Sequence, residues 1–156
     1  MTIYTIGHSN LSMKDFLQIL KSNHIDRVVD VRSSPYSKHV LHFNKKHIQK
    51  AVENAHIGYH YLGQKIGGKP RSAKYYSNGE VNYDLLSKTL KFKEGIREIV
   101  LMAREHEVVL MCSEENPYQC HRHHLIGQKM QAKGFQLIHL RKDGEKEKVD
   151  YQKKLF

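Results

Sequence analysis

Val108-Val109-Leu110-Met111-Cys112-Ser113-Glu114 is a stretch in which an uninterrupted apolar segment meets a thiol and a carboxylate. Its first four residues predict the most apolar strand of the chain, and such a strand lies inside a sheet whose two faces are both covered. Further carboxylates, a second thiol, imidazoles and a guanidinium follow, as far as His124. Because burying unpaired polar groups costs several kcal/mol each, this mixture indicates a functional site.

Predicted strands and helices alternate on both sides of this segment. Apolar and β-branched runs predict strands at 3–6, 27–31, 57–62 and 135–140, and helical spacing predicts helices at 12–20, 46–55, 83–106 and 121–133. The third helix is expected to break near 91–95, and Gly134 stands where a left-handed helix cap is needed. This alternation predicts a three-layer α/β sandwich with a mainly parallel sheet of about five strands and helices on both faces.

Two segments show no such periodicity. Residues 63–79 are rich in glycine and are predicted to form a long functional or mobile loop. Residues 141–156 are predicted to be a charged C-terminal tail with a turn at Asp143-Gly144 and one final helical turn. A chain of 156 residues without a linker is expected to fold as a single α/β domain over 1–156.

The composition bears on the expected location of the protein in the cell and on the state of its cysteines. No apolar run approaches the roughly 18 residues of a membrane span, and the start of the chain lacks the features of a secretory signal, so we expect a cytoplasmic protein that does not enter membranes. Two cysteines in a reducing compartment are expected to be thiols, metal ligands or a redox pair rather than a permanent disulfide.

The chain is strongly basic. Its 26 Lys and Arg residues exceed its 16 Asp and Glu residues, which gives a formal net charge of +10. A positive field of this kind attracts nucleic acid, nucleotides or other anionic ligands, although a merely solvated basic surface has the same composition. The expected partner is therefore an anionic ligand, and the sequence leaves the oligomeric state open.

Three polar clusters begin where predicted strands end. They are Gly7-His8-Ser9, Asp30-Val31-Arg32 and Cys112-Ser113-Glu114. In open α/β sheets ligands bind beyond the carboxyl ends of the strands. We therefore expect these clusters and the segment around Cys120 to share one site.

The residue types in these clusters suggest distinct roles. We predict catalytic roles for five residues, with Cys112 as a nucleophile that a nearby helix start activates, Cys120 with His121 as a second candidate thiol beside a base, and Asp30 or Glu114 handling protons. The predicted substrate-binding residues are His8, Ser9, Arg32 and Arg122. Several of these roles have a structural alternative, namely inert cysteines, a structural ion pair between Asp30 and Arg32, and a solvated Glu114.

The same residues include potential metal ligands. Cys112, Cys120 and the histidines offer suitable ligands, but seven residues separate the cysteines, whereas structural zinc sites use pairs two to four apart. The prediction therefore assigns no metal and leaves any cofactor unknown.

The order of short motifs resembles one known family. Thr5-Ile6-Gly7-His8-Ser9, Val29-Asp30-Val31-Arg32 with Pro35, and Cys112-Ser113-Glu114 with Cys120-His121-Arg122 are similar to the domain of unknown function family 488, the YeaO-like proteins. Two further matching segments are His42-Phe43-Asn44 and Tyr61-Leu62-Gly63 with Gly67-Gly68. The resemblance implies a single α/β domain and a family whose activity is not settled.

A weaker likeness is to rhodanese-type domains, which also place Asp-Val-Arg at one strand end and a reactive cysteine at another. The related cysteine phosphatases carry an arginine six residues after the cysteine, where this chain has Tyr118; its first arginine after Cys112 is Arg122. This departure argues against a phosphatase-type loop.

Three functions remain open on the sequence alone. The first is an enzyme acting on a phosphate-bearing or nucleic-acid-related substrate. The second is a non-enzymatic module that binds nucleic acid or another anion through its basic surface. The third is a metal or thiol-redox sensor built on Cys112, Cys120 and neighbouring histidines.

Overall fold

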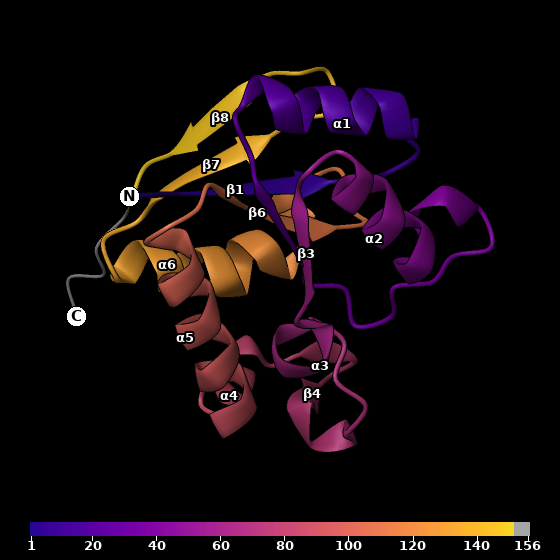
Figure 1. The fold of residues 1–156 in the computed structure, drawn as a ribbon. Helices are drawn as coiled ribbons and strands as arrows, with labels where there is room; N and C mark the ends of the chain where they lie inside the picture. The colour runs from indigo at the N-terminus through magenta and orange to yellow at the C-terminus, as the bar shows by residue number, and fades with distance from the viewer. Residues whose placement is uncertain (152–156) are drawn as a thin grey trace.

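A six-stranded sheet forms the centre of the computed structural model, which describes residues 1–151 (Figure 1). The strand order is β3-β2-β6-β1-β7-β8, and every neighbouring pair is parallel except β7 with β8. The bounds are β1 Thr2–Gly7, β2 Arg27–Asp30, β3 Gly58–Tyr61, β6 Val108–Cys112, β7 Gln136–Leu140 and β8 Lys146–Val149. All five residues of β6 are buried, as its apolar sequence predicted.

Helices cover both faces of the sheet, which confirms the predicted three-layer α/β architecture (Figure 1). One face carries α1 (Met13–Ser22) and α2 (Lys45–Asn54), and the other carries α5 (Leu90–Ala103) and α6 (Gln128–Ala132). Successive side chains of a strand point to opposite faces. Accordingly Val109 and Met111 of β6 join the α1 and α2 core, whereas Val108 and Leu110 join the α5 and α6 core.

Local side-chain chemistry sets the helix ends. The Ser12 hydroxyl accepts the Asp15 backbone N–H at the start of α1, as its position before an amphipathic segment predicted. The break expected near 91–95 instead falls between α4 (Tyr83–Ser87) and α5, because Thr89 caps α5 through the Phe92 N–H. A π-helical turn, Arg122–Gly127, precedes α6, and Gly134 adopts φ +91° after it.

Two segments contain more structure than predicted. The charged tail provides β8, an edge strand that pairs antiparallel with β7. The glycine-rich segment holds the short helix α3 (Gly63–Ile66), and a hairpin of β4 (Tyr76–Ser77) and β5 (Glu80–Val81) follows it. The turn at Asp143-Gly144 is present, whereas a final helical turn within 152–156 would lie outside the described residues. The single-domain organisation over 1–156 stays a prediction.

Within residues 1–151, no helix combines the length and the apolar composition that crossing a membrane requires.

Candidate active site

The ends of three adjacent strands meet at one edge of the sheet. β6 lies between β2 and β1, and the backbone pairing continues past the strands: His8 N–H donates to the Cys112 carbonyl (2.8 Å) and Val31 N–H to the Met111 carbonyl (3.0 Å). Ser9 N–H donates to the Ser113 carbonyl (3.0 Å). The three polar clusters of the sequence are therefore side by side, as the parallel topology predicted.

Gly7 allows the loop after β6 to pack against β1. A Cβ atom at this position would lie 1.8 Å from the Glu114 carbonyl oxygen, which no side chain can tolerate without a backbone shift. Glycine is therefore required for this close approach. The approach places the backbone of Glu114 over the strand ends.

Two thiols and one imidazole gather at this edge. The Cys112 and Cys120 sulfurs and a ring nitrogen of His121 all lie within 4.8 Å of one another, and the three residues are buried. Nε2 of His121 lies 2.9 Å from the Val31 carbonyl oxygen, so this nitrogen carries the proton and donates. Nδ1 consequently faces the Cys120 sulfur, at 3.5 Å, as an acceptor when the ring is neutral.

The two thiols differ in their electrostatic surroundings. A hydrogen bond from the Cys120 thiol holds the pKa of Cys112 well below its ordinary value; burial opposes this, and His121 and the Glu114 backbone N–H reinforce it. The same hydrogen bond, together with burial, raises the pKa of Cys120. The surroundings therefore favour negative charge on Cys112 over negative charge on Cys120.

Asp30 and Arg32 form a buried bidentate pair beside the thiols. The Arg32 Nε and Nη2 atoms donate to the two carboxylate oxygens of Asp30 at 2.9 and 2.8 Å. The Tyr59 hydroxyl donates to Asp30 Oδ2 (2.6 Å), and Arg32 Nη1 lies 3.2 Å from Nε2 of His8. The fork geometry fixes the plane of the guanidinium, so Arg32 is held rigidly between the ends of β2 and β1.

His8 is neutral in this arrangement. Its Nδ1 lies 2.8 Å from the Ser9 carbonyl oxygen and must donate, which leaves Nε2 to accept from Arg32. The ring stacks on Phe43 with a centroid distance of 4.3 Å. Burial lowers the pKa of His8 to about 4, and the Arg32 cation adds to this effect.

This neutral histidine predicts a loss of stability in acid. Unfolded His8 takes up a proton near its ordinary pKa of about 6.5, whereas folded His8 does so only near 4. The free energy of unfolding should therefore fall as pH drops from about 6.5 toward 4, with His8 contributing up to roughly 3 kcal/mol. Urea denaturation from about pH 5 to about pH 7 should show that the free energy of unfolding changes less with pH in His8→Gln than in the wild type. Equal slopes would contradict the assignment.

Other predicted site residues are placed differently. The Glu114 side chain is exposed, so this residue faces the site through its backbone N–H rather than its carboxylate. Ser9 is half-buried with φ 46°, and its carbonyl oxygen accepts from His8.

Arg122 is completely buried and binds the protein itself. It donates to the carbonyl oxygens of Glu114 and Glu115 and to the Thr5 hydroxyl (3.1 Å). Thr5 in turn lies 2.6 Å from His139 Nδ1. Within residues 1–151 no carboxylate lies within ion-pair distance of Arg122. Thr5, His139 and Tyr59 thus support the site, although the sequence predicted no site role for them; Thr5 alone lies within one of the family-like motifs.

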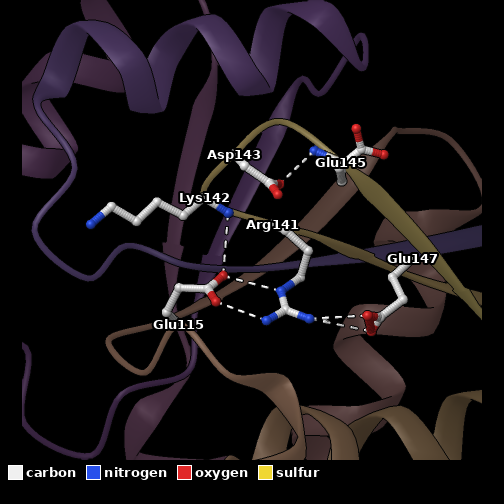
Figure 2. A pocket seen from close by; sticks show the side chains of 6 residues that line it. All are labelled: Glu115, Arg141, Lys142, Asp143, Glu145 and Glu147. Atoms are coloured by element: carbon white, nitrogen blue, oxygen red, sulfur yellow. Dashed lines mark hydrogen bonds and ion pairs between the residues drawn. The ribbon is translucent and has the colours of Figure 1, made fainter.

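A second arginine holds the same loop from the β7–β8 turn. Figure 2 shows Arg141 between Glu115 and Glu147, with Arg141 Nη2 and Nε donating to the Glu115 carboxylate at 2.8 and 3.1 Å. Arg141 Nη1 donates to Glu147 Oε1 at 3.0 Å. These groups line a surface hollow but neutralise one another. Neither the thiols nor His121 line it, so we interpret the network as a clamp on the loop.

The chemistry of Cys112, Cys120 and His121 would also suit a soft metal ion. A structural zinc site needs four protein ligands, and within residues 1–151 no fourth Cys, His, Asp or Glu joins the group. The nearby charge on Arg32 also acts on Cys112. A neighbouring cation favours an anion over a metal ion at this position.

The fold and site define an α/β protein with a buried Cys-Cys-His cluster at the carboxyl edge of a parallel sheet. The family model described as "Domain of unknown function DUF488" matches residues 12–128, and the chain belongs to this family. No curated protein and no solved structure matches the chain. The weaker likeness to rhodanese-type domains finds no support in these comparisons.

Proposed function

We propose that the protein is an enzyme in which Cys112 acts as a thiolate nucleophile on a phosphate-bearing or nucleic-acid-related substrate. The observation that carries the proposal is the buried cluster in which the Cys120 sulfur and a His121 ring nitrogen lie within 4.8 Å of the Cys112 sulfur, in surroundings that hold the pKa of Cys112 below its ordinary value. A thiolate stabilised in this way at a strand end is the reactive form of cysteine.

Arg32 is the group that would orient an anionic substrate. Asp30 and His8 use three of its five N–H groups in the described part of the chain, which leaves two, in fixed directions, for a bound oxyanion. Asp30 then acts as a positioning residue that fixes the guanidinium. Guanidinium recognises phosphate and carboxylate through paired hydrogen bonds, which favours an anion beside Cys112.

The loop after α3 supplies further positive charge. Gly68 packs so closely on the His121 ring that a Cβ atom there would lie 2.7 Å from it. The next residue, Lys69, is anchored through its backbone N–H to the Ser33 hydroxyl (2.8 Å), and Lys69 and Arg71 are exposed. Together with the net charge of +10 these cations would attract an anionic substrate. A binding module that used only this surface would give the buried thiolate no role.

The proposal predicts a thiolate at neutral pH. The ultraviolet absorbance of the thiolate should titrate in the wild type well below the ordinary cysteine pKa of about 8.5, because Cys120, His121 and the Glu114 backbone together stabilise the charge on Cys112. Cys112→Ser should abolish this titration, and Cys120→Ala should move it upward by removing the thiol that stabilises the Cys112 thiolate. Inorganic phosphate should slow alkylation of Cys112 by iodoacetamide in the wild type but not in Arg32→Met.

The matched control is His124→Asn, an exposed imidazole of the same segment, which should titrate like the wild type. A titration near the ordinary thiol pKa, or one that survives Cys112→Ser, would refute the thiolate assignment. Phosphate protection that persists in Arg32→Met would refute only the role of Arg32 and would leave the thiolate assignment standing.

A further inference from the structure

We infer that Cys112 and Cys120 form a redox pair: a low-molecular-weight disulfide oxidises them to an intramolecular disulfide that is easily reduced again. This inference deepens the proposed function and rests on it, because Cys112 is the attacking group in both. Oxidation would block the nucleophile, and reduction would restore it.

The positions of the sulfurs carry the inference. The Cys112 and Cys120 sulfurs lie within 4.8 Å of each other, and both cysteines are free. A disulfide requires a separation of about 2.05 Å, so closure needs only a local movement. Cys120 lies between the short helix Pro117–Gln119 and the π-helical turn. Its approach to Cys112 therefore involves this connecting segment and not the buried strand β6.

His121 is placed to activate the second thiol. Because its Nε2–H is committed to the Val31 carbonyl oxygen, Nδ1 faces the Cys120 sulfur and can accept the thiol proton. The Arg122 backbone N–H also points at Cys120 Sγ (3.5 Å) and stabilises negative charge developing there. Cys112 therefore serves as the first attacking thiolate, and Cys120 serves as the resolving thiol.

The chemistry balances with glutathione disulfide as oxidant. The Cys112 thiolate attacks one sulfur of glutathione disulfide, which forms a mixed disulfide and expels one glutathione thiolate. His121 takes the Cys120 proton while the Cys120 sulfur attacks Cys112, which forms the Cys112–Cys120 bond and expels the second glutathione thiolate. The proton passes from His121 to this leaving thiolate. Two electrons thus move from the protein to glutathione disulfide.

Charge balance explains why the disulfide would be easily reduced. Arg122 is a fully buried cation without a carboxylate partner within residues 1–151, and it favours negative charge at the adjacent Cys120. The thiolate shared by the pair supplies that counter-charge, and a neutral disulfide removes it. A protein that stabilises its reduced, charged form has an oxidising disulfide.

Mass spectrometry after incubation with glutathione disulfide tests the pair directly. The wild-type protein should lose two hydrogen atoms, Cys120→Ser should retain one glutathionyl group on Cys112, and Cys112→Ser should stay unmodified. His121→Asn should slow the conversion of mixed to intramolecular disulfide by about a hundredfold, as expected for loss of a general base. His124→Asn, the exposed neighbour, should not. Reduced glutathione in excess should return the oxidised wild type fully to thiols.

The outcomes separate this inference from the proposed function. A wild-type protein that keeps the mixed disulfide, or one whose intramolecular disulfide resists excess glutathione, would overturn the redox pair and leave the Cys112 thiolate standing. The redox pair is also overturned by an unmodified protein that still shows thiolate absorbance. An unmodified protein without that absorbance would overturn the proposed function as well.

Discussion

Replacing Arg122 with methionine is expected to lower the free energy of unfolding by about 3 to 5 kcal/mol. The guanidinium is fully buried and satisfies the carbonyl oxygens of Glu114 and Glu115 and the Thr5 hydroxyl. Methionine fills a similar volume but leaves the two carbonyl oxygens without this donor, whereas Thr5 keeps its contact with His139, and each buried unsatisfied group costs about 1–3 kcal/mol. Replacing the guanidinium also removes the cost of burying its charge, which offsets part of the loss in stability.

Urea denaturation at neutral pH measures this effect. Arg104→Met, an exposed arginine just after α5, is the matched control and should stay within about 0.5 kcal/mol of the wild type. Arg122→Lys should fall between the two, because one ammonium cannot reproduce three separately directed donors. If Arg122→Met is as stable as Arg104→Met, Arg122 does not hold the loop.

Loss of Arg122 should also reach the thiol. Arg122 fixes the Glu114 carbonyl, and the backbone N–H of the same residue helps to lower the pKa of Cys112. Loosening this loop weakens the donor, so the thiolate titration of Cys112 should move to higher pH in Arg122→Met. A purely structural role remote from the site would leave that titration unchanged.

Periodicity predicted the parallel core of the fold but not its last strand. Strand β6 is apolar throughout because both of its faces are covered, and such a run is readable without a structure. Strand β8 consists of Lys146, Glu147, Lys148 and Val149, whose charges are typical of an edge strand that must not pair further. A charged edge strand and a charged tail have the same composition, so the sequence could not separate them.

The hairpin of β4 and β5 was missed although its signal is present. Asn78 and Gly79 both have positive φ, at 52° and 79°, as the favoured two-residue hairpin turns require. The sequence Asn-Gly between two extended dipeptides is the strongest short hairpin signal. Here the flanking strands are only two residues each, which is too short to show an alternating pattern.

The positions of the site residues are likewise predictable only in part. Parallel topology is enough to bring Cys112, Asp30 and His8 to one edge, because their strands are neighbours. The direction of a side chain after a strand depends on loop geometry, which explains why Arg122 points inward while the Glu114 side chain stays exposed. The backbone N–H that faces the thiolate has no signature in the residue type at all.

Replacing Asp30 with asparagine is expected to destabilise the protein by about 3 to 5 kcal/mol, the range found when one partner of a buried ion pair is removed. Asp30 is fully buried, Arg32 is 5% exposed, and their two side chains share a bidentate contact. Asparagine keeps one oxygen acceptor but removes the negative charge, so the Arg32 cation remains buried without compensation. The Tyr59 hydroxyl also loses its charged acceptor.

A double variant separates the charge from the packing. Asp30→Leu combined with Arg32→Met removes both charges and should recover most of the stability lost in Asp30→Asn, because hydrophobic replacement of a buried pair is often neutral. Asp150→Asn, at an exposed carboxylate, is the control and should behave like the wild type in urea denaturation. The double variant should nevertheless lose the phosphate protection of Cys112, since the oriented guanidinium is gone. A stable double variant that still protects Cys112 would show that the pair serves the fold and not the substrate.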